Sequence, residues 1–280
     1  MSAAEVETPA ERWRAALAEW AIPAEILDAA PESPWRLRPQ QFAARADRAM
    51  AEHTPTPSRA RELEALPDDG TVLDIGVGAG AASLPLLTRA SRLIAVDGDP
   101  AMLDELRARM PADVELSVVQ GMWPDVADSV DDADVVICHH VAYNVPNLDA
   151  AVRRMTEKAR RRVVMELTSV HPRTPQNFLW PIFHGIDRPA RPTASDAIDV
   201  IRACGFAPHF DEWKRRELLI AAEDLPELVA SMRRYLCLTP DRDPEIERAL
   251  AGHLVRRDGQ VGLPALPVVT VWWDAPHPAQ

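Results

Sequence analysis

Residues 72–80 read VLDIGVGAG, an apolar run that passes directly into a glycine-rich turn. Such a short apolar run is typical of a buried strand. Gly76, Gly78 and Gly80 have no Cβ atom, so the backbone here can turn tightly and approach a ligand closely. Gly76, Gly78 and Ala81 also satisfy the G-x-G-x-x-G/A pattern of dinucleotide-binding loops, so the glycines alone leave nucleoside and dinucleotide ligands open.

Two carboxylates near this turn favour one kind of ligand. Asp74 lies two residues before Gly76, where a negative charge is unfavourable beside a pyrophosphate but suits a ligand with amine and sulfonium cations. Asp97 ends the next apolar run, where a carboxylate can accept hydrogen bonds from both ribose hydroxyls. Such charge-assisted bonds contribute roughly 1.5–3 kcal/mol each. Either carboxylate could instead brace the loop.

Strand-like and helix-like segments alternate through the middle of the chain. This alternation predicts an α/β fold with parallel strands, right-handed crossovers and helices on both sheet faces. Pro85 should kink the first of these helices or delay its regular part. The apolar runs cover 71–75, 93–96, 114–119, 134–138 and 162–167, and the helical patterns cover about 81–90, 100–110 and 148–160.

The segments VLDIGVGAG (72–80) and IAVDGDPAML (94–103) occur in this order and resemble the first two motifs of class I S-adenosylmethionine-dependent methyltransferases. The bacterial small-molecule type fits best, and the resemblance runs over about 71–167. It implies a Rossmann-like, seven-stranded, mostly parallel sheet whose last strand is antiparallel. The sixth strand would then lie within 206–220 and the seventh at 268–273. It also implies S-adenosyl-L-methionine as the cofactor.

The same resemblance implies where the cofactor lies. The three glycines of the turn would contact its methionine part, Asp97 its ribose and Gly98 its adenine. The family often has a Gly-Asp pair after the third strand, where this chain has Met122 after its glycine. Backbone groups would then read the adenine, packed by Met122 or Trp123. The expected cofactor-binding residues are Asp74, Gly76, Gly78, Gly80, Asp97, Gly98, Gly121, Met122, Trp123 and His139.

The fourth strand runs into His139, His140 and, shortly after, Tyr143, beside the expected methyl donor. A histidine with a pKa near neutrality can take a proton from a hydroxyl nucleophile, so His140 or His139 is the candidate base. A histidine that only binds the cofactor or a loop is equally compatible, because many methyl transfers need mainly in-line positioning. The Asn/Asp-Pro-Pro-aromatic motif of amino-methylating enzymes is absent. No third ligand accompanies the two histidines, so no metal site is predicted.

The proline distribution separates this regular middle from its flanks. Residues 1–70 hold eight prolines, 71–170 five and 171–280 thirteen. We interpret 1–70 as an N-terminal helical cap and 71–280 as the methyltransferase domain, with lid insertions at about 171–193 and 224–258, the second a helical insertion before the last strand. Open α/β sheets bind ligands at the carboxyl edge, where these additions would lie. The candidate substrate residues are Phe42, Arg45, Tyr143, Trp180 and His184.

Composition excludes several classes of protein. The formal net charge is −12, which disfavours a nucleic-acid substrate. No apolar run reaches the ~18 residues of a membrane helix, and no signal peptide is visible. Three widely spaced cysteines fit a reducing cytoplasm, and a homodimer is compatible with the sequence.

The expected function is methyl transfer from S-adenosylmethionine to a small, partly apolar molecule, with a hydroxyl oxygen as the favoured acceptor. Two alternatives stay open from the sequence. The first is an NAD(P)-dependent oxidoreductase, against which Asp74 argues. The second is a non-catalytic module that binds S-adenosylmethionine.

Overall fold

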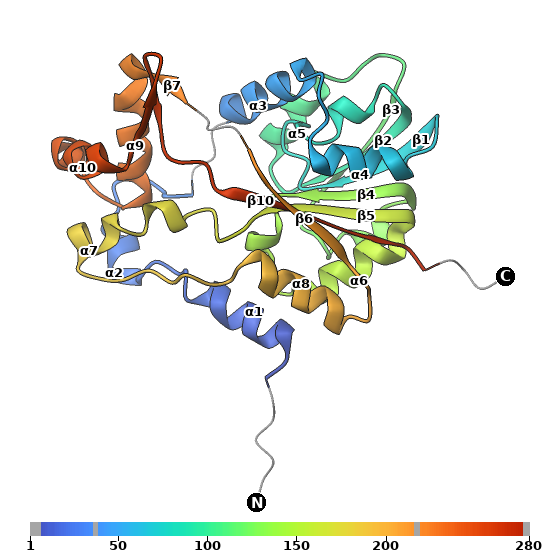
Figure 1. The fold of residues 1–280 in the computed structure, drawn as a ribbon, viewed down its shortest axis with the longest axis horizontal. Coiled ribbons are helices and arrows are strands. Elements are labelled where there is room, and N and C mark those ends of the chain that lie inside the picture. The colour runs from blue at the N-terminus through green and yellow to red at the C-terminus, as the bar shows by residue number, and fades with distance from the viewer. Residues whose placement is uncertain (1–6, 36–38, 216–218, 277–280) are drawn as a thin grey trace, which may run out of the picture.

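The computed structural model describes residues 7–35, 39–215 and 219–276. Its centre is a seven-stranded sheet of order β3-β2-β1-β4-β5-β10-β6 (Figure 1). Strand β10 runs antiparallel to both of its neighbours, whereas the other pairings are parallel. The predicted α/β fold, with an antiparallel strand from the C-terminal part of the chain, is therefore confirmed. The strands are β1 (Gly70–Ile75), β2 (Ala90–Asp97), β3 (Glu115–Gln120), β4 (Ala133–His139), β5 (Ala159–Thr168), β6 (His209–Lys214) and β10 (Pro267–Asp274).

Helices cover both faces of the sheet, which is why its central strands are apolar on both sides. Helices α1 (Pro9–Ala18), α6 (Leu148–Lys158) and α8 (Ala194–Ala203) pack on one face, and α3 (Pro39–Ala51), α4 (Pro57–Ala65) and α5 (Pro100–Arg107) on the other (Figure 1). Local signals start several of them. Thr8 and Glu11 form a capping box at α1, and the Asp99 side chain accepts from the Ala101 N–H at α5. The N-terminal helices thus contribute to both layers.

The prediction of a regular helix over 81–90 is wrong. Only the short 3-10 helix η1 (Leu84–Leu86) forms there, flanked by turns. Pro85 has no backbone N–H and cannot donate within an α-helix. The segment instead forms backbone hydrogen bonds between residues three apart in the chain. Leu86 N–H donates to the Ser83 carbonyl (2.9 Å), and Arg89 N–H donates to the Leu86 carbonyl (3.0 Å).

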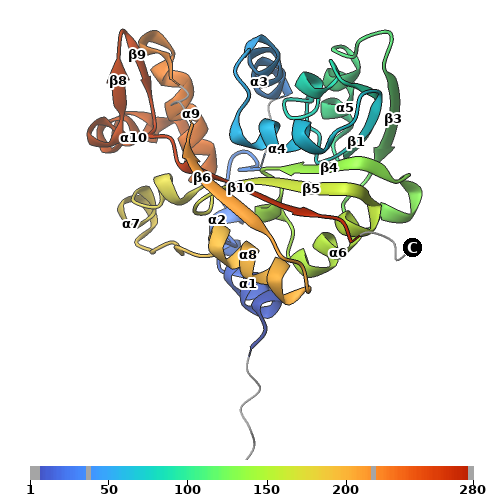
Figure 2. The same cartoon turned by 45° about the vertical axis from the view of Figure 1, so that its right-hand side comes forward.

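The elements that we call the lid form a separate apolar cluster at the end of the sheet where β5 ends and β10 begins (Figures 1 and 2). Trp180 and Tyr235 are almost fully buried in it. Its elements are α2 (Ala24–Asp28), α7 (Leu179–His184), α9 (Leu225–Tyr235), α10 (Asp243–Leu250) and a small sheet of β7 (Ile220–Ala221), β9 (Gln260–Gly262) and β8 (Val255–Arg257). Short 3-10 helices connect the chain: η2 (Ala127–Ser129), η3 (Ala142–Asn144), η4 (Thr174–Gln176), η5 (Ala222–Asp224), η6 (Pro240–Arg242) and η7 (Ala251–His253).

Candidate active site

The glycine loop follows β1 at the carboxyl edge of the sheet. Gly76, Gly78 and Gly80 have φ of 70°, 54° and 89°, the left-handed region that favours glycine. A Cβ on Gly76 would lie 2.4 Å from the Val141 side chain. The loop therefore packs against the segment that follows β4, and only glycine fits at this point.

Asp97 braces the glycine loop from the end of β2. Its Oδ2 accepts from the Gly78 N–H (2.8 Å) and its Oδ1 from the Asp99 N–H (2.9 Å). A carboxylate oxygen has two lone-pair sites, so each oxygen can still accept a ribose hydroxyl. The bracing and ribose-binding interpretations of Asp97 are thus compatible.

The segment after β3 lies beside Gly98, where adenine is expected. A Cβ on Gly98 would lie 2.6 Å from the Met122 sulfur, and Met122 is 59% exposed. Gly121 donates its N–H to the Asp97 carbonyl at 2.9 Å. Trp123 points elsewhere, because it is buried and its indole N–H donates to the Ala151 carbonyl at 3.1 Å. Of the two candidate side chains, Met122 is the one at this exposed edge.

Two buried carboxylates form an acidic floor beneath the loop, which we define as Asp74 and Glu62. Burial raises the pKa of Asp74 to about 7, although the Ser83 hydroxyl and His139 oppose this. Glu62 reaches the same region from α4 and is 1% exposed. Among the described residues, no hydrogen-bond donor meets Asp74 Oδ2 or Glu62 Oε2, whereas Glu62 Oε1 lies 2.6 Å from His139 Nε2. Such unsatisfied buried oxygens favour a cationic ligand.

His139 lies between two carboxylates. Its Nε2 is 2.6 Å from Glu62 Oε1, and its Nδ1 is 4.0 Å from Glu166 Oε2. Burial lowers the pKa of His139, but Glu62 and Glu166 outweigh this effect and raise it to about 9. His139 therefore carries a proton at neutral pH and is poorly suited to accept another.

His140 has a different environment, because its φ of 59° turns the chain at the end of β4. Its Nε2 lies 2.9 Å from Glu166 Oε1, and its side chain is 32% exposed. Glu166 also accepts from the Ser58 hydroxyl at 2.6 Å. Burial would raise the pKa of Glu166, but His139 and His140 outweigh it and hold the pKa below its ordinary value.

Glu166 thus orients His140. A carboxylate is a strong acceptor, so the shared proton belongs on Nε2 and Nδ1 keeps its lone pair. No described residue hydrogen-bonds to Nδ1. His140 can therefore accept a proton at Nδ1 from a ligand, as a general base requires.

The other predicted residues divide into two groups. Phe42 and Arg45 of α3 lie by the glycine loop: the Phe42 ring is 3.5 Å from a Cβ placed on Gly78, and the Arg45 guanidinium is 5.3 Å from the ring centre. Trp180 and His184 lie on α7 inside the lid, where His184 Nε2 is 2.7 Å from the Leu236 carbonyl.

Tyr143 lies in η3, close to the two histidines in the chain. It is buried and donates its hydroxyl to the Thr168 carbonyl at 2.7 Å. Burial raises the pKa of Tyr143. Its hydroxyl proton is therefore held by the carbonyl of Thr168, the last residue of β5.

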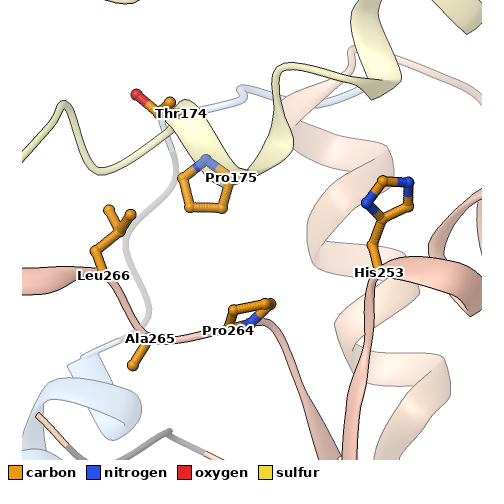
Figure 3. Close-up of a pocket in the computed structure, with 6 residues that line it drawn as sticks. All are labelled: Thr174, Pro175, His253, Pro264, Ala265 and Leu266. Carbon is orange, nitrogen blue, oxygen red and sulfur yellow. The ribbon is translucent and has the colours of Figure 1, made fainter. Parts of the chain in front are cut away.

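A cavity of about 270 Å³ lies where the lid meets the sheet edge (Figure 3). Pro175 and Pro264 face each other across it, with His253 to one side. The lining is mostly apolar and comes from η4, η7 and the segment before β10: Thr174, Pro175, His253, Pro264, Ala265 and Leu266.

Sequence reasoning missed Glu62 and Glu166. The sequence could have indicated Glu166, since a charged residue within the apolar run RVVMEL rarely faces a core without a partner. It could not have indicated Glu62, because an acidic residue on a polar helix normally faces solvent.

Comparisons with known proteins agree with this fold. Residues 72–162 match the family described as methyltransferase domain. An uncharacterized protein of Haemophilus influenzae is 34% identical over 114 residues, which are 40% of this chain and 40% of that protein. The YcgJ protein of Bacillus subtilis superposes with a TM-score of 0.52 and 17% identity, covering 81% of this chain and 98% of that one. A cyclopropane-fatty-acyl-phospholipid synthase-like protein of Lactobacillus casei gives 0.53 and 14%, covering 89% and 97%. At these identities the likeness to solved structures concerns the fold.

The matched segment and the sheet order agree with the sequence resemblance. Residues 72–162 match the methyltransferase domain family, and the sheet has the predicted antiparallel β10. S-adenosylmethionine is the cofactor that this resemblance implies, and the residues present fit it. The unsatisfied oxygens of the acidic floor suit its ammonium and sulfonium cations, and Asp97 has lone pairs left for its ribose.

The described ranges contain neither a membrane-spanning helix nor a metal-binding cluster. None of their helices is long and apolar enough to cross a membrane. Nor do these ranges contain a group of three or more His, Cys, Asp or Glu side chains that could hold a metal ion.

Proposed function

We propose that this chain transfers a methyl group from S-adenosylmethionine to a hydroxyl oxygen of a small, partly apolar molecule in the cytoplasm. His140 is the general base. The observation that carries this proposal is the Glu166–His140 pair at the carboxyl end of β4, with Nε2 on the carboxylate and Nδ1 unoccupied by described residues.

In this proposal, different residues bind different parts of the cofactor. The acidic floor holds the cationic end of the cofactor, and the glycine loop lets the backbone come close to it. Asp97 holds the ribose hydroxyls, and Met122 packs on the adenine. Phe42 covers the loop from above. S-adenosylmethionine supplies, when bound, a methyl group activated by a positive sulfur.

His140 then acts on the acceptor. His140 would take the hydroxyl proton at Nδ1 as the oxygen bonds to the methyl carbon, and the methyl–sulfur bond of the donor would break to leave S-adenosylhomocysteine. Glu166 stabilises the imidazolium that results, because its carboxylate already faces Nε2. His139, already protonated, positions Glu62 and Glu166.

The lid supports a small, partly apolar acceptor. The cavity beside η4 has room for a small molecule, and its prolines, Ala265 and Leu266 favour an apolar portion. Neither a nucleic acid nor a membrane surface is part of this proposal.

Two measurements test the function. Methyl-labelled S-adenosylmethionine is incubated with the protein and a small-molecule extract, and titration calorimetry compares S-adenosylmethionine with NADH. We expect label in a small molecule and binding of S-adenosylmethionine alone. Binding of NADH alone would indicate the oxidoreductase alternative, and cofactor binding without label transfer would indicate the non-catalytic module.

The role of His140 is tested by His140→Gln. We expect label transfer to fall about 10²- to 10⁴-fold, because a positioned base contributes this much. The affinity for S-adenosylhomocysteine should stay within about twofold. His209→Gln, on the exposed strand β6, is the matched control and should leave transfer unchanged. Full transfer by His140→Gln would refute the base.

A further inference from the structure

Two arginines near the candidate site have no carboxylate partner among the described residues. Arg215 follows β6, and its guanidinium lies 3.3 Å from His140 Nε2. Arg45 comes from α3 and lies 5.3 Å from the Phe42 ring, which itself lies by Gly78 of the glycine loop. Neither forms an ion pair within the described ranges. In a chain of net charge −12, guanidinium groups without an acidic partner are unexpected.

The two guanidinium groups act on each other. Partial desolvation, Arg215 and Arg48 together lower the pKa of Arg45. Like charges held together raise the energy of the unliganded chain, and an anion between them would remove this repulsion. Both arginines are exposed, so a ligand can reach them.

The contact between Arg215 and His140 does not satisfy Arg215. One nitrogen cannot donate to Glu166 and accept from Arg215 at the same time. Since Glu166 is the stronger acceptor and lies at 2.9 Å, Nε2 carries the proton. The Arg215 guanidinium therefore faces His140 without an acceptor there.

The site thus contains both kinds of charge. The buried acidic floor suits the cations of the cofactor. The exposed Arg215 beside His140 and the exposed Arg45 by the glycine loop suit an anion. The cationic cofactor would therefore contact the carboxylates, and an anionic methyl acceptor would contact the arginines.

We propose that Arg45 and Arg215 form an anion subsite beside His140 that binds a carboxylate or phosphate group of the methyl acceptor. This inference rests on the proposed function and narrows its substrate class. The acceptor is a small hydroxy acid or hydroxy phosphate whose hydroxyl meets Nδ1 of His140 while its anionic group meets the two arginines.

The subsite is tested by binding, which does not require activity. Protein saturated with S-adenosylhomocysteine is titrated with benzoate and with inorganic phosphate, and the wild type is compared with Arg45→Gln, Arg215→Gln and the double variant. We expect at least one of the two anions to bind, each single variant to weaken it about tenfold and the double variant to abolish it. Arg248→Gln, at an exposed position of α10 whose side chain donates to the Pro244 carbonyl, is the control for charge.

The results separate this inference from the function on which it rests. Failure of both anions to bind the wild type, or equal binding to the double variant, would overturn the subsite. A tenfold loss of S-adenosylhomocysteine affinity in the double variant would overturn it too, since the arginines would then bind the methionine carboxylate. Anion binding that depends on the arginines, in a protein that transfers no label, would support the subsite and refute the enzymatic function. Matching thermal unfolding curves show that the variants fold.

Discussion

Two adjacent histidines, His139 and His140, have different chemistry because the backbone turns between them. His139 ends β4 in an extended conformation and faces inward to two carboxylates. The left-handed φ of His140 directs its side chain to a half-exposed position with one carboxylate. The same residue type thereby becomes a fixed cation at one position and a candidate base at the next.

At the cofactor end, Asp97→Ala removes an acceptor for two backbone N–H groups as well as the expected ribose contact. We expect the affinity for S-adenosylhomocysteine to fall at least tenfold, measured by calorimetry. Asp99→Ala is the control: it removes the cap of α5, lowers the free energy of unfolding by about 1 kcal/mol, and leaves cofactor affinity within about twofold. Unchanged affinity in Asp97→Ala would refute the ribose assignment.

The side chain of Trp13 joins helix α1 to the segment that follows β4. Trp13 is fully buried, its indole N–H donates to the Val145 carbonyl at 2.9 Å, and its ring stacks on Tyr143 at 5.6 Å between centres. Since Val145 and Tyr143 follow β4, this N-terminal helix supports the segment that carries His140.

We expect Trp13→Ala to lower the free energy of unfolding by about 3–5 kcal/mol, because it leaves a large cavity. Trp13→Phe keeps an aromatic ring, loses the hydrogen bond and should cost about 1–3 kcal/mol. Urea denaturation measures both changes. Trp35→Ala, at a residue 54% exposed, should change stability little. A loss in Trp13→Ala no greater than in Trp35→Ala would contradict the role assigned to α1.

For the whole molecule, the site exists because the sheet gathers distant segments at its carboxyl edge. Glu62 comes from α4, Asp74 from β1, His139 from β4, Glu166 from β5 and Arg215 from the end of β6. The shifted pKa values of Asp74, Glu166 and the buried His139 make the stability of the fold depend on pH.

The free energy of unfolding should fall as the pH rises from about 5 to 9. The pKa of His139 is about 9 in the folded chain, above its ordinary 6.5, so its stabilisation is complete below pH 6.5 and disappears as the pH rises through 9. That stabilisation is on the order of 3 kcal/mol. Asp74 acts in the same direction, since its pKa of about 7 exceeds the ordinary 3.8 and the folded chain favours its protonated form.

Urea denaturation at a series of pH values checks this expectation. His139→Gln should flatten the decline between pH 6.5 and 9, because the group that loses its proton is gone. His209→Gln, on the exposed strand β6, should leave the decline intact. An undiminished slope in His139→Gln would show that His139 does not hold its proton as described.

Much of this organisation was predictable because the signals are local. The glycines report the backbone angles of the loop, Asp99 and Thr8 start their helices, and the apolar runs mark the strands. The regular helix over 81–90 was a wrong prediction, because the effect of Pro85 on hydrogen bonding outweighed the helical pattern.

The sequence by itself determined the sheet, the cofactor loop and the histidines after β4, since apolar periodicity, missing Cβ atoms and capping act over a few residues. Only the tertiary structure decided which histidine is free to act. Glu62 and Glu166 come from separate elements, and the pairing of β4 with β5 and the packing of α4 bring them to His139 and His140. Charge interactions depend on distance in space, and sheet order rather than sequence separation sets that distance.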